Sequence, residues 1–108
     1  MSREIKFRFY HPETGLMYED TGITSLGVNN AIKKANDSAY IVMQFTGLCD
    51  KNGKEIYELM EIDGNLEVSF IEGRYILINI SNGDIIHLYD YWRNRNGQIE
   101  ITKEYTKI

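Results

Sequence analysis

A succession of short apolar segments, separated by turns that contain glycine, most strongly constrains what this chain can fold into. The segments cover residues 66–70, 75–80, 85–91 and 99–105. They are rich in β-branched and aromatic side chains, which is typical of strands. Asn-Gly pairs and a Glu-Gly pair lie between them, and such pairs form tight hairpin turns. Four short strands joined in this way predict a β-meander or a small β-barrel.

The first half of the chain predicts a hairpin, a short helix and a further strand. Residues 4–10 alternate between apolar and charged side chains, as in a half-buried strand, and Arg8 falls on the polar side. A turn containing proline and glycine leads back into a second strand at 16–18. Apolar residues at helical spacing predict a helix over 28–35, and the apolar run at 40–45 predicts another strand.

Length and composition indicate one soluble domain. We expect a single domain over residues 1–108, with the hairpin, helix and strand in 1–48 and the barrel in 49–108. The 12 basic and 16 acidic residues give a net charge of −4, which argues against diffuse attraction to nucleic acid. The lone Cys49 cannot form an intrachain disulfide and fits a reducing compartment. No segment has the pattern of a signal peptide or a membrane span, so we expect a cytoplasmic protein.

The most specific pattern lies in the middle of the chain. Residues 40–58 read Tyr-Ile-Val-Met-Gln-Phe-Thr-Gly-Leu-Cys-Asp-Lys-Asn-Gly-Lys-Glu-Ile-Tyr-Glu, and residues 3–8 read Arg-Glu-Ile-Lys-Phe-Arg. Both segments, in this order, resemble the YopX family of phage and prophage proteins. The resemblance implies an SH3-like β-barrel in the C-terminal part and a phage or prophage source. It implies no established activity, and a small barrel does not specify one.

Two segments depart from the family pattern. Residues 59–62 read Leu-Met-Glu-Ile where the family usually has Gly-Asp-Ile-Val, so the turn at this point must form differently. Residues 99–103 lack the glycine of the Gly-Asn-Ile-Tyr-like segment near the end of the family pattern.

Neither catalysis nor metal binding is indicated by the residue pattern. His11 and His87 are far apart and show no spacing typical of metal ligands, and Cys49 has no recognisable base beside it in the sequence. No phosphate-binding glycine motif is present. We therefore predict a non-enzyme without catalytic residues, cofactor or metal. Asp50 is interpreted as a cap for the turn at Asn52-Gly53, with a recognition loop as the alternative.

The stretch from Tyr89 to Arg95 is the best candidate for a binding site. Its aromatic side chains alternate with charged ones, and on a strand Tyr89 and Tyr91 would share one side. Such residues are typical of protein-interaction hot spots, of single-stranded nucleic-acid binding, or of a half-buried strand. The predicted interaction surface consists of Tyr89, Tyr91, Trp92, Arg93 and Arg95. The alternative, a basic face for nucleic acid, consists of Arg3, Lys6 and Arg8.

The residue pattern predicts a mostly β protein with one short helix, in which an N-terminal hairpin leads into a small β-barrel, and the resemblance implies that this barrel is SH3-like. The predicted function is non-catalytic: a phage accessory protein that binds a host or phage protein. The alternatives are a small nucleic-acid-binding module and an inhibitor of a host defence system. The apolar residues on both faces of 75–80 also predict weak self-association. We expect no membrane partner.

Overall fold

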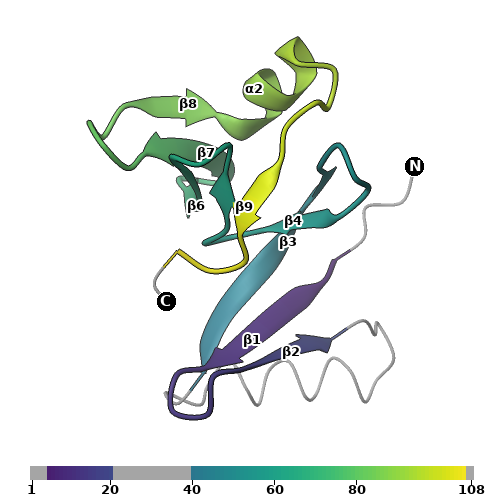
Figure 1. The fold of residues 1–108 in the computed structure, drawn as a ribbon, viewed down its shortest axis with the longest axis vertical. Coiled ribbons are helices and arrows are strands. Elements are labelled where there is room, and N and C mark those ends of the chain that lie inside the picture. The colour runs from purple at the N-terminus through teal and green to yellow at the C-terminus, as the bar shows by residue number, and fades with distance from the viewer. Residues whose placement is uncertain (1–4, 21–39, 107–108) are drawn as a thin grey trace. The chain divides into compact units, whose positions relative to one another are not determined.

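A computed structural model describes residues 5–20 and 40–106 of the chain. The chain divides into two compact units, Met1–Gly47 and Leu48–Ile108 (Figure 1). The helix predicted over 28–35 and the side chain of Arg3 lie outside the described residues. That the two units act as a single domain remains a prediction.

Unit 1 contains the predicted hairpin and a strand paired with it. Strand β1 (Phe7–His11) is antiparallel to β2 (Leu16–Asp20) and, on its other side, to β3 (Ile41–Cys49). The hairpin turn is closed by the Gly15 N–H, which donates to the His11 carbonyl at 2.8 Å. These strands were predicted, although β3 extends beyond the predicted end at residue 45 and crosses into unit 2.

Arg8 corrects the alternation predicted for the first strand. Its side chain is buried, with 2% of its surface exposed, whereas Ile5 on the supposed apolar side is 52% exposed. Met43 is the cross-strand partner of Arg8, and the guanidinium donates to the Met43 Sδ at 3.4 Å. The arginine stem is long and apolar enough to be buried with its charged end directed at an acceptor. Strand periodicity treats every charged residue as solvent-facing, so it misplaced this one.

Unit 2 contains a five-stranded sheet with the strand order β8-β7-β6-β5-β9. Its strands are β5 (Glu61–Ile62), β6 (Leu66–Ile71), β7 (Arg74–Asn79), β8 (Ile85–His87) and β9 (Ile101–Lys103). The paired strands are antiparallel. Strand β4 (Glu55–Tyr57) is not part of this sheet. It follows β3 in a four-stranded sheet with the order β2-β1-β3-β4. The expected fold class is confirmed: the protein is mostly β, with a small barrel-like arrangement and one short helix in its described part.

Backbone conformation explains two of the turns in unit 2. Glu72 and Gly73 both have positive φ (52° and 80°) and join the paired residues Ile71 and Arg74, as in a two-residue hairpin loop. Leu59 also has a positive φ, of 65°. The departure from the family pattern at this position therefore places leucine in a conformation that favours glycine. The Leu59 N–H donates to the Val68 carbonyl at 2.8 Å, which holds this turn against β6.

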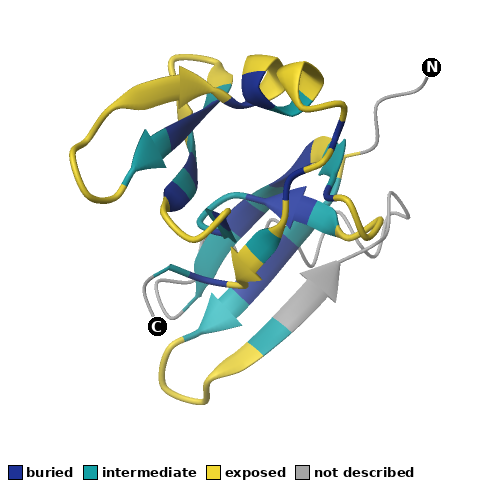
Figure 2. Cartoon of the chain, turned by 45° about the horizontal axis from the view of Figure 1, so that its top comes forward, coloured by how far each residue is buried: buried dark blue, intermediate teal, exposed yellow. Residues whose placement is uncertain are grey.

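The core of unit 2 is formed by residues from most of its strands and from the helix. Val68 and Leu77 are cross-strand partners on the buried face of the sheet. The fully buried side chains are Ile56, Met60, Ile62, Val68, Leu77, Leu88 and Ile99. Figure 2 shows this buried interior in dark blue and the exposed length of β8 in yellow. No helix among the described residues is long and apolar enough to cross a membrane.

The strand predicted over 85–91 is wrong beyond its first three residues. Strand β8 ends at His87, and helix α2 (Leu88–Asn94) follows at once. Leu88 and Tyr91 are buried three positions apart, which is the spacing of one helical face. The negative charge of Asp90 in the first turn and the positive charge of Arg93 in the last turn interact favourably with the helix dipole. The strand predicted over 99–105 is shorter in the structure, where β9 spans only Ile101–Lys103.

Candidate functional site

Helix α2 divides the predicted interaction residues between two environments. Tyr91 is 9% exposed, whereas Tyr89 is 57% exposed. The prediction that these tyrosines share one side is wrong, because residues two positions apart lie about 200° apart around a helix. Tyr91 therefore belongs to the core of unit 2, and Tyr89 belongs to its surface.

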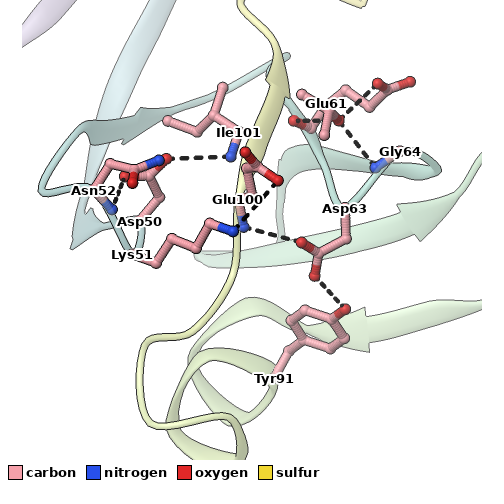
Figure 3. A network of polar contacts seen from close by, with 10 residues as sticks. Asp50, Lys51, Asn52, Glu61, Asp63, Gly64, Tyr91, Glu100 and Ile101 are labelled. Carbon is pink, nitrogen blue, oxygen red and sulfur yellow. Dashed lines mark hydrogen bonds and ion pairs between the residues drawn. The ribbon is translucent and has the colours of Figure 1, made fainter.

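The hydroxyl of Tyr91 is fixed by a carboxylate from the turn after β5. It donates to the Asp63 Oδ2 at 2.7 Å (Figure 3). On the ring itself, the Arg95 guanidinium carbon lies 3.7 Å from the ring centroid, a cation–π geometry. Burial, followed by the hydrogen bond and the negative charge of Asp63, raises the pKa of Tyr91 to about 12, although Arg95 acts in the opposite direction. Tyr91 therefore anchors α2 to unit 2.

Asp63 joins three segments of unit 2 that are distant in the sequence. Besides accepting from Tyr91, its carboxylate accepts from the Glu100 N–H at 2.9 Å. The Asp63 N–H in turn donates to the Glu100 carbonyl at 2.8 Å. Figure 3 shows this carboxylate between α2 and the segment that enters β9. The position of α2 is therefore set by contacts with the sheet as well as by its own apolar residues.

Asp50 forms a second carboxylate centre at the same end of β9, where the strand begins. Its Oδ1 accepts from the Asn52 N–H at 2.9 Å, and its Oδ2 accepts from the Ile101 N–H at 3.3 Å (Figure 3). The Lys54 N–H also donates to Oδ1, at 2.9 Å. Burial alone raises the pKa of this carboxyl group, but the backbone hydrogen bonds outweigh it and hold the pKa below its ordinary value. The geometry matches the interpretation of Asp50 as a turn cap.

Trp92 lies between the core and the surface. Its indole Nε1 donates to the Cys49 carbonyl at 2.9 Å, and its ring stacks with Tyr89 at a centroid distance of 6.5 Å. Its polar N–H is satisfied within unit 2, so the ring is held in one orientation. Stacking against the oriented indole also restricts the orientation of the exposed Tyr89 ring.

Gly97 is closely packed against the indole, which leads to a testable prediction. It has a φ of 74°, and a Cβ placed there would lie 3.3 Å from the Trp92 Cε2 and Cζ2. We expect Gly97→Ala to lower the free energy of unfolding by about 1–2 kcal/mol in urea titrations. Gly83→Ala is the matched control, because its φ is 79° and nothing lies within 4 Å of the added Cβ. Equal losses in both variants would show that contact with the indole contributes nothing.

The remaining exposed groups of α2 form a compact aromatic and cationic set. The Arg93 guanidinium lies 5.4 Å from the centroid of the Tyr89 ring and 3.4 Å from the Asp90 Oδ1. Arg95 is also exposed beside the helix end. We call Tyr89, Trp92, Arg93 and Arg95 the α2 surface. It contains the predicted interaction residues except Tyr91, whose ring is buried beneath Arg95.

The alternative basic face, predicted from Arg3, Lys6 and Arg8, does not include Arg8. Arg8 is buried, so its assignment to an exposed face is wrong. Lys6 is held near Phe45, with its Nζ 5.4 Å from the ring centroid. The third member, Arg3, lies outside the described residues.

The histidines and the cysteine have ordinary surroundings. His11 accepts from the Thr14 N–H at 3.4 Å through Nδ1 and meets the Tyr40 ring edge-on at 5.0 Å. His87 is exposed on β8, and Cys49 is a free thiol of intermediate exposure. Among residues 5–20 and 40–106, no group of three or more His, Cys, Asp or Glu side chains is arranged to hold a metal ion.

Comparison with known proteins identifies the family. Residues 6–99 match the family described as YopX protein. No curated protein matches the chain. The family match spans both units and includes β1, the β3–β4 region and all of α2. Because it covers well over half of the 108 residues, the chain belongs to the YopX family.

Proposed function

We propose that this protein is a non-catalytic accessory protein of phage or prophage origin that binds a host or phage protein through the α2 surface. The observation that carries the proposal is the 57% exposure of Tyr89 on a helix whose opposite face is anchored in the core. An exposed aromatic ring on a fixed support is typical of binding hot spots, which are enriched in Tyr, Trp and Arg.

Pre-organisation favours this role for α2. Tyr91 ties the helix to Asp63, and Trp92 ties it to the Cys49 carbonyl. Tyr89 stacks on the oriented indole, and Arg93 lies near its ring. A partner that contacts Tyr89 therefore immobilises few free rotamers. This reduces the entropy loss that normally opposes association.

The charge distribution favours a protein partner over nucleic acid. The chain has a net charge of −4, and Asp90 lies beside Arg93 on the same helix. Nucleic-acid affinity comes mainly from the neutralisation of several phosphates. The burial of Arg8 further reduces the cations available for that purpose. Inhibition of a host defence system is a special case of protein binding and would be recognised by the identity of the partner.

Pull-down from an infected host lysate, with and without nuclease, tests the proposal. We expect a protein partner that survives nuclease, and we expect Tyr89→Ala to weaken its binding by about 2 kcal/mol, or roughly 30-fold. Circular dichroism should show an unchanged fold, because Tyr89 is mostly exposed.

Phe70→Ala provides the control for aromatic truncation elsewhere on the surface. Phe70 is 44% exposed on β6 and should be dispensable for capture. If folded Tyr89→Ala captures the partner as well as the wild type does, the α2 surface is not the binding site. A partner lost on nuclease treatment would instead support nucleic-acid binding.

A further inference from the structure

An exposed ridge is formed by Asp84, by β8 and by the outer side of α2, and it ends at Arg95. Strand β8 is the last in its sheet order, so among the described strands none pairs with its outer edge. Along the ridge, Ile85, Ile86 and Tyr89 are 62%, 38% and 57% exposed. Figure 2 shows β8 exposed along its whole length, and Figure 1 shows it leading directly into α2. Exposed apolar groups beside an open sheet edge indicate an association surface.

The charges along this ridge are asymmetric. The exposed Asp84 lies at its start, and Arg93 and Arg95 lie at its end. Asp84 forms no ion pair with the described residues, and the pair between Arg93 and Asp90 is solvent-exposed and therefore weak. The ridge therefore has the acidic Asp84 at one end and Arg95 at the other, with Ile85 and Tyr89 between them and the charge of Asp90 balanced by Arg93. These ends are complementary to the same ridge running in the opposite direction.

The lengths of the two halves support such antiparallel pairing. From Asp84 to His87 the extended chain covers about 10 Å at roughly 3.3 Å per residue. From Leu88 to Arg95 the helix and its last residue cover about 11 Å at 1.5 Å per residue. A twofold axis near the junction of β8 and α2 would therefore bring the acidic end of each ridge close to the basic end of the other.

We propose that a second copy of this chain is a partner for the ridge, with the two copies related by a twofold axis. In this dimer β8 of each copy lies along α2 of the other, and Asp84 of each copy pairs with Arg95 of the other. Ile85 of one copy, the more exposed of the two isoleucines, covers Tyr89 of the second copy. The proposal rests on the proposed protein-binding function of the α2 surface and names one partner for it. A twofold contact repeats each pair, so one substitution alters two contacts.

Sedimentation equilibrium of the full chain tests the association. We expect the mean mass to rise from 12.6 kDa toward twice that value between about 10 and 300 μM. Ile85→Lys should hold the protein at the monomer mass, because it places a charged group in the apolar contact with Tyr89 of the second copy. Ile71→Lys is the matched control. Ile71 is 42% exposed on the interior strand β6, so this variant should associate like the wild type.

Charge reversal tests the twofold pairing itself. Asp84→Arg alone and Arg95→Asp alone should each weaken the dimer about tenfold or more, because each places like charges together twice. An equimolar mixture of the two variants should recover dimerisation, since the mixed dimer again has two opposite-charge pairs. The double variant should also recover it.

The outcomes distinguish a second copy of the chain from a different protein as the partner of the ridge. A wild type that stays at the monomer mass across the range, or a mixture that does not recover, overturns the dimer. If the chain is monomeric but Tyr89→Ala still loses a nuclease-resistant partner, the ridge binds a different protein and the proposed function stands. If Tyr89→Ala retains that partner, the proposed function fails whatever the mass measurements show.

Discussion

Replacing Tyr91 with alanine is expected to lower the free energy of unfolding by about 3–5 kcal/mol. The substitution removes a buried ring from beneath Arg95 and the hydroxyl that donates to Asp63. Urea unfolding followed by circular dichroism measures the loss. Tyr89→Ala is the matched control on the same helix and should change stability by less than about 0.5 kcal/mol, because its ring is exposed. Similar losses in both variants would contradict the assignment of Tyr91 to the core.

Tyr91→Phe separates the hydroxyl from the ring. We expect it to cost about 1–2 kcal/mol, since the ring still packs but Asp63 loses one donor. In alkali, the raised pKa of about 12 means that the folded protein keeps the phenolic proton after the unfolded chain has lost it. The stabilisation from this group is therefore complete below about pH 10 and is lost as the pH rises through 12.

Titration by tyrosinate absorbance checks this expectation. The wild type should show a tyrosinate step near pH 12 that is missing in Tyr91→Phe. If the step persists in the variant, it belongs to another tyrosine and not to Tyr91.

Replacing Asp50 with alanine is expected to lower the free energy of unfolding by about 2–3 kcal/mol, because three backbone N–H groups lose their acceptor. Two of them lie in the turn after β3, and the third belongs to Ile101 in β9. Asp50→Asn should have a smaller effect: an amide oxygen at the Oδ1 position still accepts from Asn52 and Lys54, while the amide nitrogen faces the Ile101 donor. Urea unfolding at neutral pH measures both losses.

The acid dependence of stability provides an independent test of Asp50. Its pKa is lower in the folded protein than its ordinary value of 3.8. The stabilisation from the ionised carboxylate is therefore complete well above pH 4 and is lost as the pH falls through the lowered folded pKa. The stability difference between wild type and Asp50→Asn should shrink over that range. A difference that stays constant from neutral pH to below the folded pKa would rule out the charged form as the source of stability.

Much of the β architecture was predictable from local sequence signals. The hairpin of β1 and β2, the strand β3 and the glycine turn between β6 and β7 follow from alternation and from turn residues. These signals depend on backbone conformations within a few residues, such as the positive φ of Gly73. The resemblance at residues 40–58 also led to the family, which the match over 6–99 confirmed.

The candidate site was predictable in composition but not in geometry. The mixture of aromatic residues and arginines between Tyr89 and Arg95 marked the segment, whereas its helical form was missed. Seven residues complete only about two turns of helix, so period two and period 3.6 are hard to distinguish over this length. A helix this short is not stable alone in water, and burial of Leu88 and Tyr91 decides its formation.

By itself, the sequence determined that the chain is mostly β, where most of its turns lie and which family it belongs to. Only the tertiary structure decided which polar residues are buried and which aromatic ring is exposed. Tyr91 and Asp63 are 28 positions apart, and Asp50 and Ile101 are 51 positions apart. Periodicity reports which side of its own element a residue occupies, but it carries no information about the distant group that meets it there. That group decides whether Arg8 is buried and whether Tyr89 remains available for binding.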